Sequence, residues 1–270
     1  MSRPAVLRLE ADPGLPVDMT GVLPGRLAGR AEGEVAAVPV RVGNRRVPLG
    51  ELFRVTPGAE PHLLVENAFP RLDRLGAGMG VGTIEVHGDV GAYLGLQLRG
   101  GRIVATGSAG DFVGAEMRGG TISVRANAGA FLGASLPGSA HGMSGGAVLV
   151  RGDAGDRACD RMRRGLVVVG GRVGNYPAAR MIGGTLLARG GCGAYPGYAM
   201  RRGSLLLALA PETPLQLFAD DGLHDLPWLG LLGRHLAGLG WEQEPFPNRV
   251  RHLTGDVTAG GKGELLLAAG

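Results

Sequence analysis

The apolar positions of the chain recur every 19 residues over its central part. Each block opens with glycine, carries apolar residues at its third and fifth positions, and has another glycine at its tenth position in six of the blocks. A weaker copy with Gly76 and Met79 in matching positions indicates that the pattern begins near Leu63. A fixed period of this length is typical of a solenoid, because one repeat cannot bury its apolar side without neighbours. The blocks start at Gly82, Gly101, Gly120, Gly146, Gly165, Gly184 and Gly203.

Two further positions of the block repeat a residue type. Stacked coils lie about 4.8 Å apart and align equivalent positions, so we expect an aromatic ladder along one wall and a ladder of methionine and leucine inside. The twelfth-position residues are Tyr93, Phe112, Phe131, Arg157, Tyr176 and Tyr195. The seventeenth-position residues are Leu98, Met117, Leu136, Met162, Met181 and Met200.

The block therefore predicts an all-β fold. Its third and fifth residues form a short strand with two inward side chains, and its glycines supply the corners that residues with a Cβ resist. A left-handed helix of three equal six-residue steps needs about 18 residues per coil, and the marked positions here are unequally spaced. We predict a right-handed parallel β-helix with about seven 19-residue coils.

The flanks depart from the repeat. We assign residues 1–62 to an N-terminal strand segment, 63–210 to the β-helix, and 211–270 to a C-terminal cap with a helix and terminal strands. Apolar residues from Leu226 to Trp241 follow a helical spacing. We expect this helix to cover the open end of the β-helix, or to form a docking surface with Trp228 as a partner contact.

Composition narrows the class of protein. With 51 glycines among 270 residues and 44% hydrophobic residues, the chain has enough apolar side chains to fold. The net charge of +4 comes without a basic stripe interleaved with aromatics, and no stretch resembles a signal peptide or membrane span. Cys159 and Cys192 suggest neither a disulfide framework nor a thiolate cluster. We expect a cytoplasmic protein that binds neither nucleic acid nor membrane.

The clearest blocks, such as Gly82 to Gly100, read G-x-[IV]-x-V-x-G-x-x-G-x-[YF]-x-G-x-x-[ML]-x-G. This repeat resembles the glycine-rich domain shared by three proteins. They are the C subunit of formylmethanofuran dehydrogenase, the C subunit of the bacterial formyltransferase/hydrolase complex, and the C-terminal part of the glutamate synthase large subunit. Residues Glu34 to Val55 and Leu253 to Leu267 are similar to the flanks of the two C subunits, so the resemblance extends over nearly the whole chain.

The resemblance implies a non-catalytic subunit in one-carbon metabolism that itself binds no cofactor. The formyltransferase/hydrolase complex moves a formyl group from tetrahydromethanopterin to a methanofuran-type carrier and hydrolyses it to formate during formaldehyde oxidation. Its implied partners are an amidohydrolase-like metal subunit and a formyltransferase subunit. The alternatives are the C subunit of a molybdenum or tungsten formylmethanofuran dehydrogenase and a stand-alone glutamate-synthase-type subunit. The Arg-rich, Lys-poor composition favours the bacterial complex.

The residues themselves offer no catalytic constellation. The sequence contains no G-x-S-x-G motif and no cysteine with a catalytic signature, and its six histidines lack metal-ligand spacing. We therefore expect neither catalytic nor metal-binding residues, which also argues against a free-standing β-helix lyase.

One irregularity interrupts the repeat. Seven extra residues, Ser139 to Gly145, interrupt the third block, after which the register resumes. Bulges from regular solenoids often carry function or assembly contacts. We take His141 and Met143 as candidate partner contacts, although a solvated loop explains them equally well.

Arginine recurs at the eighteenth position of the block, next to the inward methionine or leucine. Alternation directs these side chains outward. Because the resemblance implies a carrier with glutamyl groups, a basic ladder here could guide it by electrostatic attraction; a solvated corner or a subunit interface are the alternatives. The candidate carrier contacts are Arg99, Arg118, Arg163 and Arg201.

Overall fold

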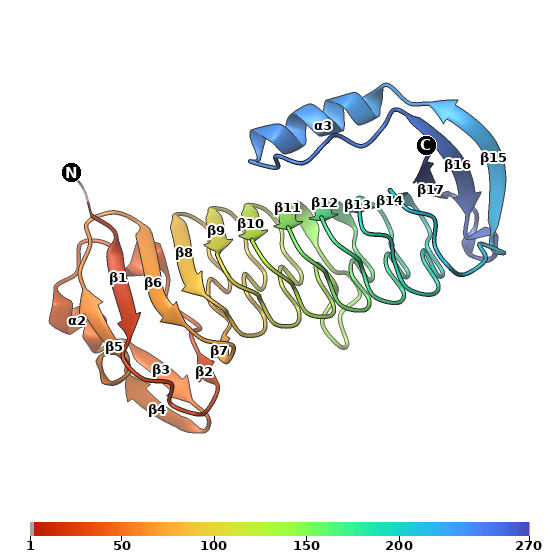
Figure 1. Ribbon diagram of the computed structural model, residues 1–270. Helices are drawn as coiled ribbons and strands as arrows, with labels where there is room; N and C mark the ends of the chain where they lie inside the picture. The colour runs from red at the N-terminus through yellow and green to blue at the C-terminus, as the bar shows by residue number, and fades with distance from the viewer. Residues whose placement is uncertain (1–2, 270) are drawn as a thin grey trace.

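The computed structural model describes residues 3–269 and consists mainly of strands stacked along one long axis (Figure 1). Within these residues the large sheet has 13 strands in the order β15-β16-β17-β14-β13-β12-β11-β10-β9-β8-β6-β1-β5. The expected all-β class is confirmed. Its parallel strands are β1 (Ala5–Leu9), β6 (His62–Ala68), β8 (Thr83–Gly88), β9 (Arg102–Ala105), β10 (Thr121–Val124), β11 (Ser144–Val150), β12 (Arg164–Val169), β13 (Thr185–Ala188), β14 (Gly203–Leu207) and β17 (Gly263–Ala268). The antiparallel strands at its two ends are β5 (Phe53–Thr56), β15 (Phe218–Asp225) and β16 (Arg249–Gly255).

Equivalent positions of successive blocks pair with each other, as the repeat predicts. The third position of each block lies opposite the third position of the next, with an offset of 19 residues that lengthens only across the insertion. All these side chains are fully buried. After the last block, Leu205 pairs with Leu265, so β17 adds one more level to the stack. The paired residues are Ile84, Ile103, Ile122, Val148, Val167, Leu186 and Leu205.

The internal ladder of long apolar residues is present, with one change. Met143, not Leu136, fills the slot of the third block: its side chain is fully buried, whereas Leu136 is half-buried. The Met143 N–H donates to the Gly133 carbonyl at 2.9 Å, and the Met143 carbonyl accepts from the Arg163 N–H at 2.9 Å. The extra residues therefore precede Met143. The sequence pattern could not place them, because Leu136 and Met143 are both long, apolar and seven residues apart.

The C-terminal helix does not cover the open end of the stack. Helix α3 (Trp228–Gly238) lies along the outer face of the large sheet (Figure 1), and β17 pairs with the last coil instead. Strands β11 to β14 all direct apolar fourth-position side chains outward, whereas the fourth positions of β8, β9 and β10 are Glu85, Val104 and Ser123. This second apolar face requires a cover. The residues buried between helix and sheet include Leu149, Val168, Leu187, Leu206, Leu229, Leu236, Trp241 and Phe246.

A smaller four-stranded sheet, in the order β4-β3-β2-β7, stands at the N-terminal end. Strand β7 leads into the stack, because the Leu72 carbonyl accepts from the Gly91 N–H at 3.0 Å. From there, isolated parallel bridges link the ninth positions of successive blocks, from Val90 to Cys192. The small sheet thus continues a second side of the stack. Its strands are β2 (Val17–Asp18), β3 (Pro39–Val42), β4 (Arg45–Pro48) and β7 (Leu72–Asp73). The short helices are α1 (Pro24–Leu27), α2 (Glu32–Ala36), η1 (Leu49–Glu51) and η2 (Val257–Ala259).

The tenth-position glycines are required by the closeness of the coils, which gives a first prediction. A Cβ on Gly155 would lie 2.6 Å from the Ala130 nitrogen and 2.9 Å from the Gly129 carbonyl carbon, both backbone atoms of the preceding coil. We expect Gly155→Ala to lower the free energy of unfolding by about 1–3 kcal/mol, because the coils must separate locally. Urea unfolding of the purified chain measures this.

The matched control for this prediction is Gly80→Ala. A Cβ on Gly80 meets no atom within 4 Å, so we expect a change within about 0.5 kcal/mol. Equal effects of the two substitutions would contradict the close approach of the coils at the tenth position.

Candidate functional site

The twelfth-position residues form the expected ladder of rings along one wall of the stack. The ring centroids of Tyr93 and Phe112 are 5.1 Å apart, those of Phe112 and Phe131 are 4.7 Å apart, and those of Tyr176 and Tyr195 are 5.0 Å apart. The ring planes differ by no more than 20°, so the rings are stacked. This wall is half-exposed and ends at Tyr195, which is 57% exposed.

Two arginines occupy rungs of the same ladder. The guanidinium of Arg74 lies 4.8 Å from the centroid of the Tyr93 ring, and that of Arg157 lies 5.1 Å from the centroid of the Tyr176 ring. A guanidinium over an aromatic face is attracted by the ring quadrupole. Arg157, the one non-aromatic residue at the twelfth position, therefore keeps the stacking in its half of the ladder.

Every rung has a backbone conformation that residues with a Cβ resist. The φ angles of Tyr93, Phe112 and Phe131 are +63°, +61° and +61°, and Arg157 and Tyr176 have +60° and +57°. The left-handed conformation costs about 1–2 kcal/mol per residue, while a stacked aromatic pair contributes about 0.5–1.5 kcal/mol beyond its burial. Stacking between coils therefore offsets the strain of the corner that turns these side chains outward.

A hollow of about 240 Å³ adjoins the ladder under the insertion. Its lining includes Phe112 and Phe131 together with Asp160, Arg161 and Arg180. The Arg161 side chain donates to the Ser139 carbonyl at 3.0 Å and so holds the inserted loop. The hollow combines flat apolar faces with guanidinium groups, which is suited to binding an aromatic or carboxylate side chain.

Asp160 organises the arginines of this hollow. Its side chain is 4% exposed and forms ion pairs with Arg180 and, at 3.3 Å, with Arg157. The hydrogen bond to Asp160 raises the pKa of the Arg180 guanidinium above its ordinary value. Sequence analysis missed Asp160. The signal was nevertheless present, because the fifteenth position is apolar or alanine in the neighbouring blocks, as in Ala134 and Ala179.

The other side of the insertion is held by Glu116. Burial acts to raise the pKa of this carboxyl, but hydrogen bonds with Ser139, Gln97 and Leu136 outweigh burial and leave the pKa below its ordinary value. The Gln97 amide donates to Glu116 at 2.9 Å, and the Leu136 N–H donates at 3.3 Å. The inserted loop is therefore held by polar contacts at Leu136 and Ser139.

The three expected partner contacts lie in different environments. His141 is exposed on the inserted loop. Met143 is fully buried, because it fills the internal-ladder slot of the third block. Its side chain therefore cannot reach a partner. Trp228 is half-buried at the start of α3 and packs against the cluster between helix and sheet.

The four expected carrier arginines occupy equivalent, exposed positions. Each backbone N–H donates to the carbonyl of the internal-ladder residue one coil earlier, as Arg99 does to Met79 and Arg118 to Leu98. Ser144 and Ile182 take the same position in the intervening coils, so the basic ladder has gaps. Arg99, Arg118, Arg163 and Arg201 form no ion pair with any residue between positions 3 and 269.

Residues 3–269 lack two further features, clustered metal ligands and a membrane-crossing helix. No group of three or more His, Cys, Asp or Glu residues in this range is arranged to hold a metal ion. None of the helices in the same range combines the length and apolar character needed to cross a membrane.

Comparison with known proteins identifies the family of the repeat. Residues 74–211 match the family model described as the GXGXG motif. The whole fold is similar to one chain of the crystal structure of the formyltransferase/hydrolase complex (FhcABCD) from Methylorubrum extorquens in complex with methylofuran. The TM-score is 0.89 at 35% sequence identity, and the match covers 98% of this chain and 100% of that chain.

Two curated relatives share shorter stretches. The C subunit of the Fhc formyltransferase/hydrolase complex of Methylorubrum extorquens is 37% identical over 90 residues, 33% of this chain and 34% of the relative. The C subunit of molybdenum-containing formylmethanofuran dehydrogenase 1 of Methanothermobacter thermautotrophicus is 35% identical over 92 residues, 33% of this chain and 23% of the relative. These alignments span about a third of the first relative's length and less of the second.

The stacked repeat and the family match define the class: the chain belongs to the GXGXG motif family. Within this class it is related to the C subunits of the formyltransferase/hydrolase complex and of formylmethanofuran dehydrogenase, which confirms the resemblance seen in the sequence.

The strain and stacking at the twelfth position give a second prediction. Phe112→Ala keeps the Cβ at φ +61° but removes the ring between Tyr93 and Phe131. We expect a loss of about 1–3 kcal/mol in the free energy of unfolding from two lost stacking contacts. Phe112→Gly also loses the ring but relieves the left-handed conformation, so it should be more stable than Phe112→Ala by about 1 kcal/mol. Chemical denaturation of both variants measures the order, and a more stable alanine variant would contradict strain at this corner.

Proposed function

We propose that this chain is the scaffold subunit of a formyltransferase/hydrolase complex that transfers a formyl group from tetrahydromethanopterin to a methanofuran-type carrier and releases it as formate. The observation that carries the proposal is the match along the whole chain to one chain of the FhcABCD structure, at 35% identity. That structure was determined with methylofuran. The proposed setting is the cytoplasm.

We propose that this chain contributes binding surfaces for other subunits and no catalytic residues. Its distinctive side chains form a rigid wall of stacked rings, a hollow lined by Phe131, Arg161 and Arg180, and outward arginines. Aromatic and arginine side chains dominate the energetics of protein interfaces. We place the catalytic residues and bound cofactors on the sister subunits, an amidohydrolase-like metal subunit and a formyltransferase subunit.

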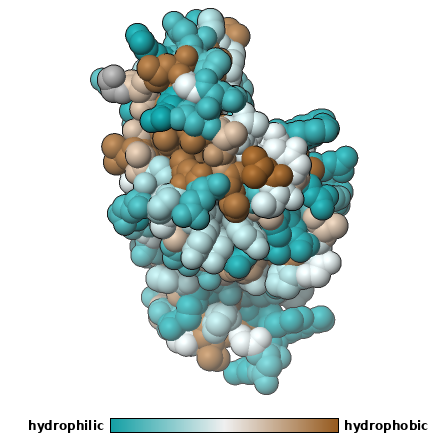
Figure 2. Space-filling model, turned by 90° about the vertical axis from the view of Figure 1, so that its right-hand side faces the viewer, coloured by the Kyte–Doolittle hydropathy of each residue, from teal (hydrophilic) through white to brown (hydrophobic). Residues whose placement is uncertain are grey.

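A second surface suited to a sister subunit lies at the C-terminal end. Figure 2 views the molecule from that end and shows apolar side chains gathered on it. Exposed apolar residues of the C-terminal part include Leu209 after β14, Leu217 just before β15, Leu223 on β15 and Val257 in η2, each at least 38% exposed. Clustered apolar surface of this kind marks interaction sites. At this end β15 is the last strand of the large sheet, with no further strand beside it among residues 3–269.

The proposal also covers the handedness of the stack and its number of coils. We infer a right-handed parallel β-helix of seven coils in residues 63–210, between a strand segment at 1–62 and a terminal cap at 211–270. Support comes from the seven successive parallel strands β8 to β14 and from the near-universal right-handed sense of crossovers between parallel strands.

The C subunit of a formylmethanofuran dehydrogenase is the second candidate. It is favoured by the relation to the Methanothermobacter thermautotrophicus protein, 35% identical over 92 residues. In both cases the chain serves as a scaffold, so the two candidates differ in their partners and not in the role of this chain.

Affinity purification of the tagged chain from its source, followed by native mass spectrometry, tests the proposal. We expect an assembly that contains an amidohydrolase-like subunit and a formyltransferase subunit. A molybdenum- or tungsten-containing subunit with iron–sulfur clusters would support the second candidate. Recovery of the chain alone, or with glutamine-dependent enzymes, would contradict both.

Charge reversal of the basic ladder tests its proposed contact with the carrier. In the purified complex, we expect Arg99→Glu with Arg118→Glu to raise the KM for a polyglutamylated carrier several-fold at low ionic strength, with a smaller effect at high salt because screening shortens the range of the attraction. The matched control is Arg30→Glu with Arg234→Glu, since both arginines are exposed. If the ladder variant assembles and keeps its KM, the arginines do not guide the carrier.

A further inference from the structure

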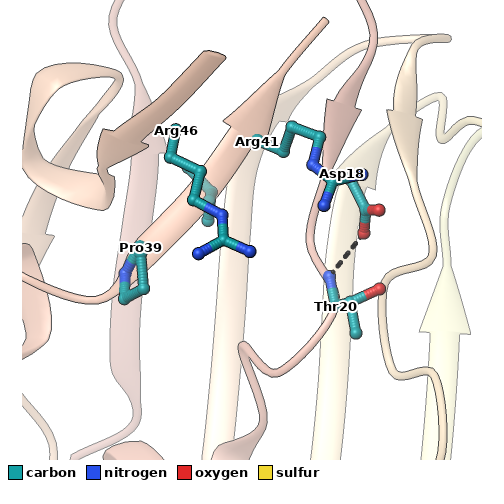
Figure 3. Close-up of a pocket in the computed structure, with 6 residues that line it drawn as sticks. Asp18, Thr20, Pro39, Arg41 and Arg46 are labelled. Atoms are coloured by element: carbon teal, nitrogen blue, oxygen red, sulfur yellow. Dashed lines mark hydrogen bonds between the residues drawn. The ribbon is translucent and has the colours of Figure 1, made fainter. Parts of the chain in front are cut away.

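Two arginines of the small N-terminal sheet lie directly opposite each other. Arg41 on β3 pairs in register with Arg46 on β4, and Arg41 also lies opposite Asp18 on β2. Paired residues point to the same face of a sheet, so these three side chains form a row across three strands. Figure 3 shows the row: in this view the Arg41 side chain extends toward Asp18, and the Arg46 side chain extends separately over the sheet.

The charges of this row are not balanced within the chain. No carboxylate in residues 3–269 forms an ion pair with Arg41 or Arg46. The nearest acid in the row, Asp18, accepts from the Thr20 N–H at 2.9 Å and lies 3.7 Å from the Arg74 guanidinium. Like charges directly opposite on a sheet destabilise it. Asp18 lies opposite Arg41 and supplies an opposite charge on one side of the row, whereas Arg46 on the edge strand β4 faces only Arg41.

The arginines line a hollow of about 340 Å³ in the face of the sheet (Figure 3). Pro39 and Val40 form apolar parts of its lining, Thr20 adds a hydroxyl group, and Asp18 adds a carboxylate. A guanidinium presents a planar fork of donors that matches a carboxylate with two parallel hydrogen bonds. Two such forks on neighbouring strands provide places for two carboxylates of one ligand.

Protection of a sheet edge does not explain the pair. β4 is the edge strand, and charged side chains on an edge prevent pairing with other chains. Arg45 and Arg46 on β4 meet that need, but Arg41 lies on β3, which is an interior strand between β4 and β2. There it lies between Asp18 on one side and Arg46 on the other, and both arginines line the same hollow.

We propose that this hollow binds an acidic peptide segment, with the Arg41 and Arg46 guanidiniums each holding one carboxylate of neighbouring glutamate or aspartate residues. The site stands apart from the ladder arginines at the eighteenth position and does not depend on the proposed function. Its binding energy is mainly electrostatic, because two guanidiniums meet two anions, while the Asp18 carboxylate in the same hollow reduces the net attraction.

Titration of the full chain with a fluorescent tetraglutamate peptide tests the site. We expect saturable binding that weakens as salt is added, and a loss of affinity of at least tenfold in Arg41→Gln with Arg46→Gln. A tetraglutamine peptide and the single variant Arg234→Gln, at an exposed arginine of α3, are the controls. Equal binding by the double variant, equal binding of tetraglutamine, or an equal loss in Arg234→Gln would each overturn the proposal.

Thermal unfolding without peptide provides a second, independent readout. Because the two arginines repel each other, we expect the double variant to unfold at the same temperature as the unmodified chain or at a higher one. A lower unfolding temperature would show that the arginines already stabilise the fold through a contact within the chain, and would overturn the argument that they await an external anion.

Discussion

Backbone hydrogen bonds between successive coils are the interaction on which this structure depends. The Thr121 N–H donates to the Gly101 carbonyl at 3.0 Å, and the Gly133 N–H donates to the Val113 carbonyl at 2.8 Å, each reaching one coil back. Side chains reinforce the same register, since the Asp111 carboxylate accepts from the Ala130 N–H at 2.7 Å. Once this register is set, every equivalent side chain must lie above its counterpart, which produces the core and the outer wall together.

The outer wall has a conformational cost, because its outward side chains stand on left-handed backbone positions. The corners at the twelfth position adopt a conformation that glycine would adopt with less strain, yet they carry rings or arginines. Stacking offsets the conformational strain only where the neighbouring coils also carry flat groups at this position. Near the insertion the wall gains a hollow in which Asp160 fixes the guanidinium of Arg180, so the regular stack presents one irregular, chemically distinct place.

The repeat predicted those features that depend on residues one block apart. Pairing of the third positions, burial of most of the methionine ladder and stacking of the rings all follow from the period. Features that depend on contacts between distant segments were missed or misplaced. Helix α3 lies on the sheet face because Val168 and Leu187 point outward there, a pattern that is visible only after the strands are stacked. The opposition of Arg41 and Arg46 likewise requires the register of a hairpin that lies outside the repeat.

In-register stacking creates a rigid wall, and we propose that a sister subunit covers it. A cryo-electron microscopy map of the assembled complex containing this chain tests that claim most directly. The prediction is that the rings of Tyr93, Phe112 and Phe131 remain stacked and are buried against another subunit, with the inserted loop at the same interface. A map in which these rings face solvent throughout the assembly would contradict it.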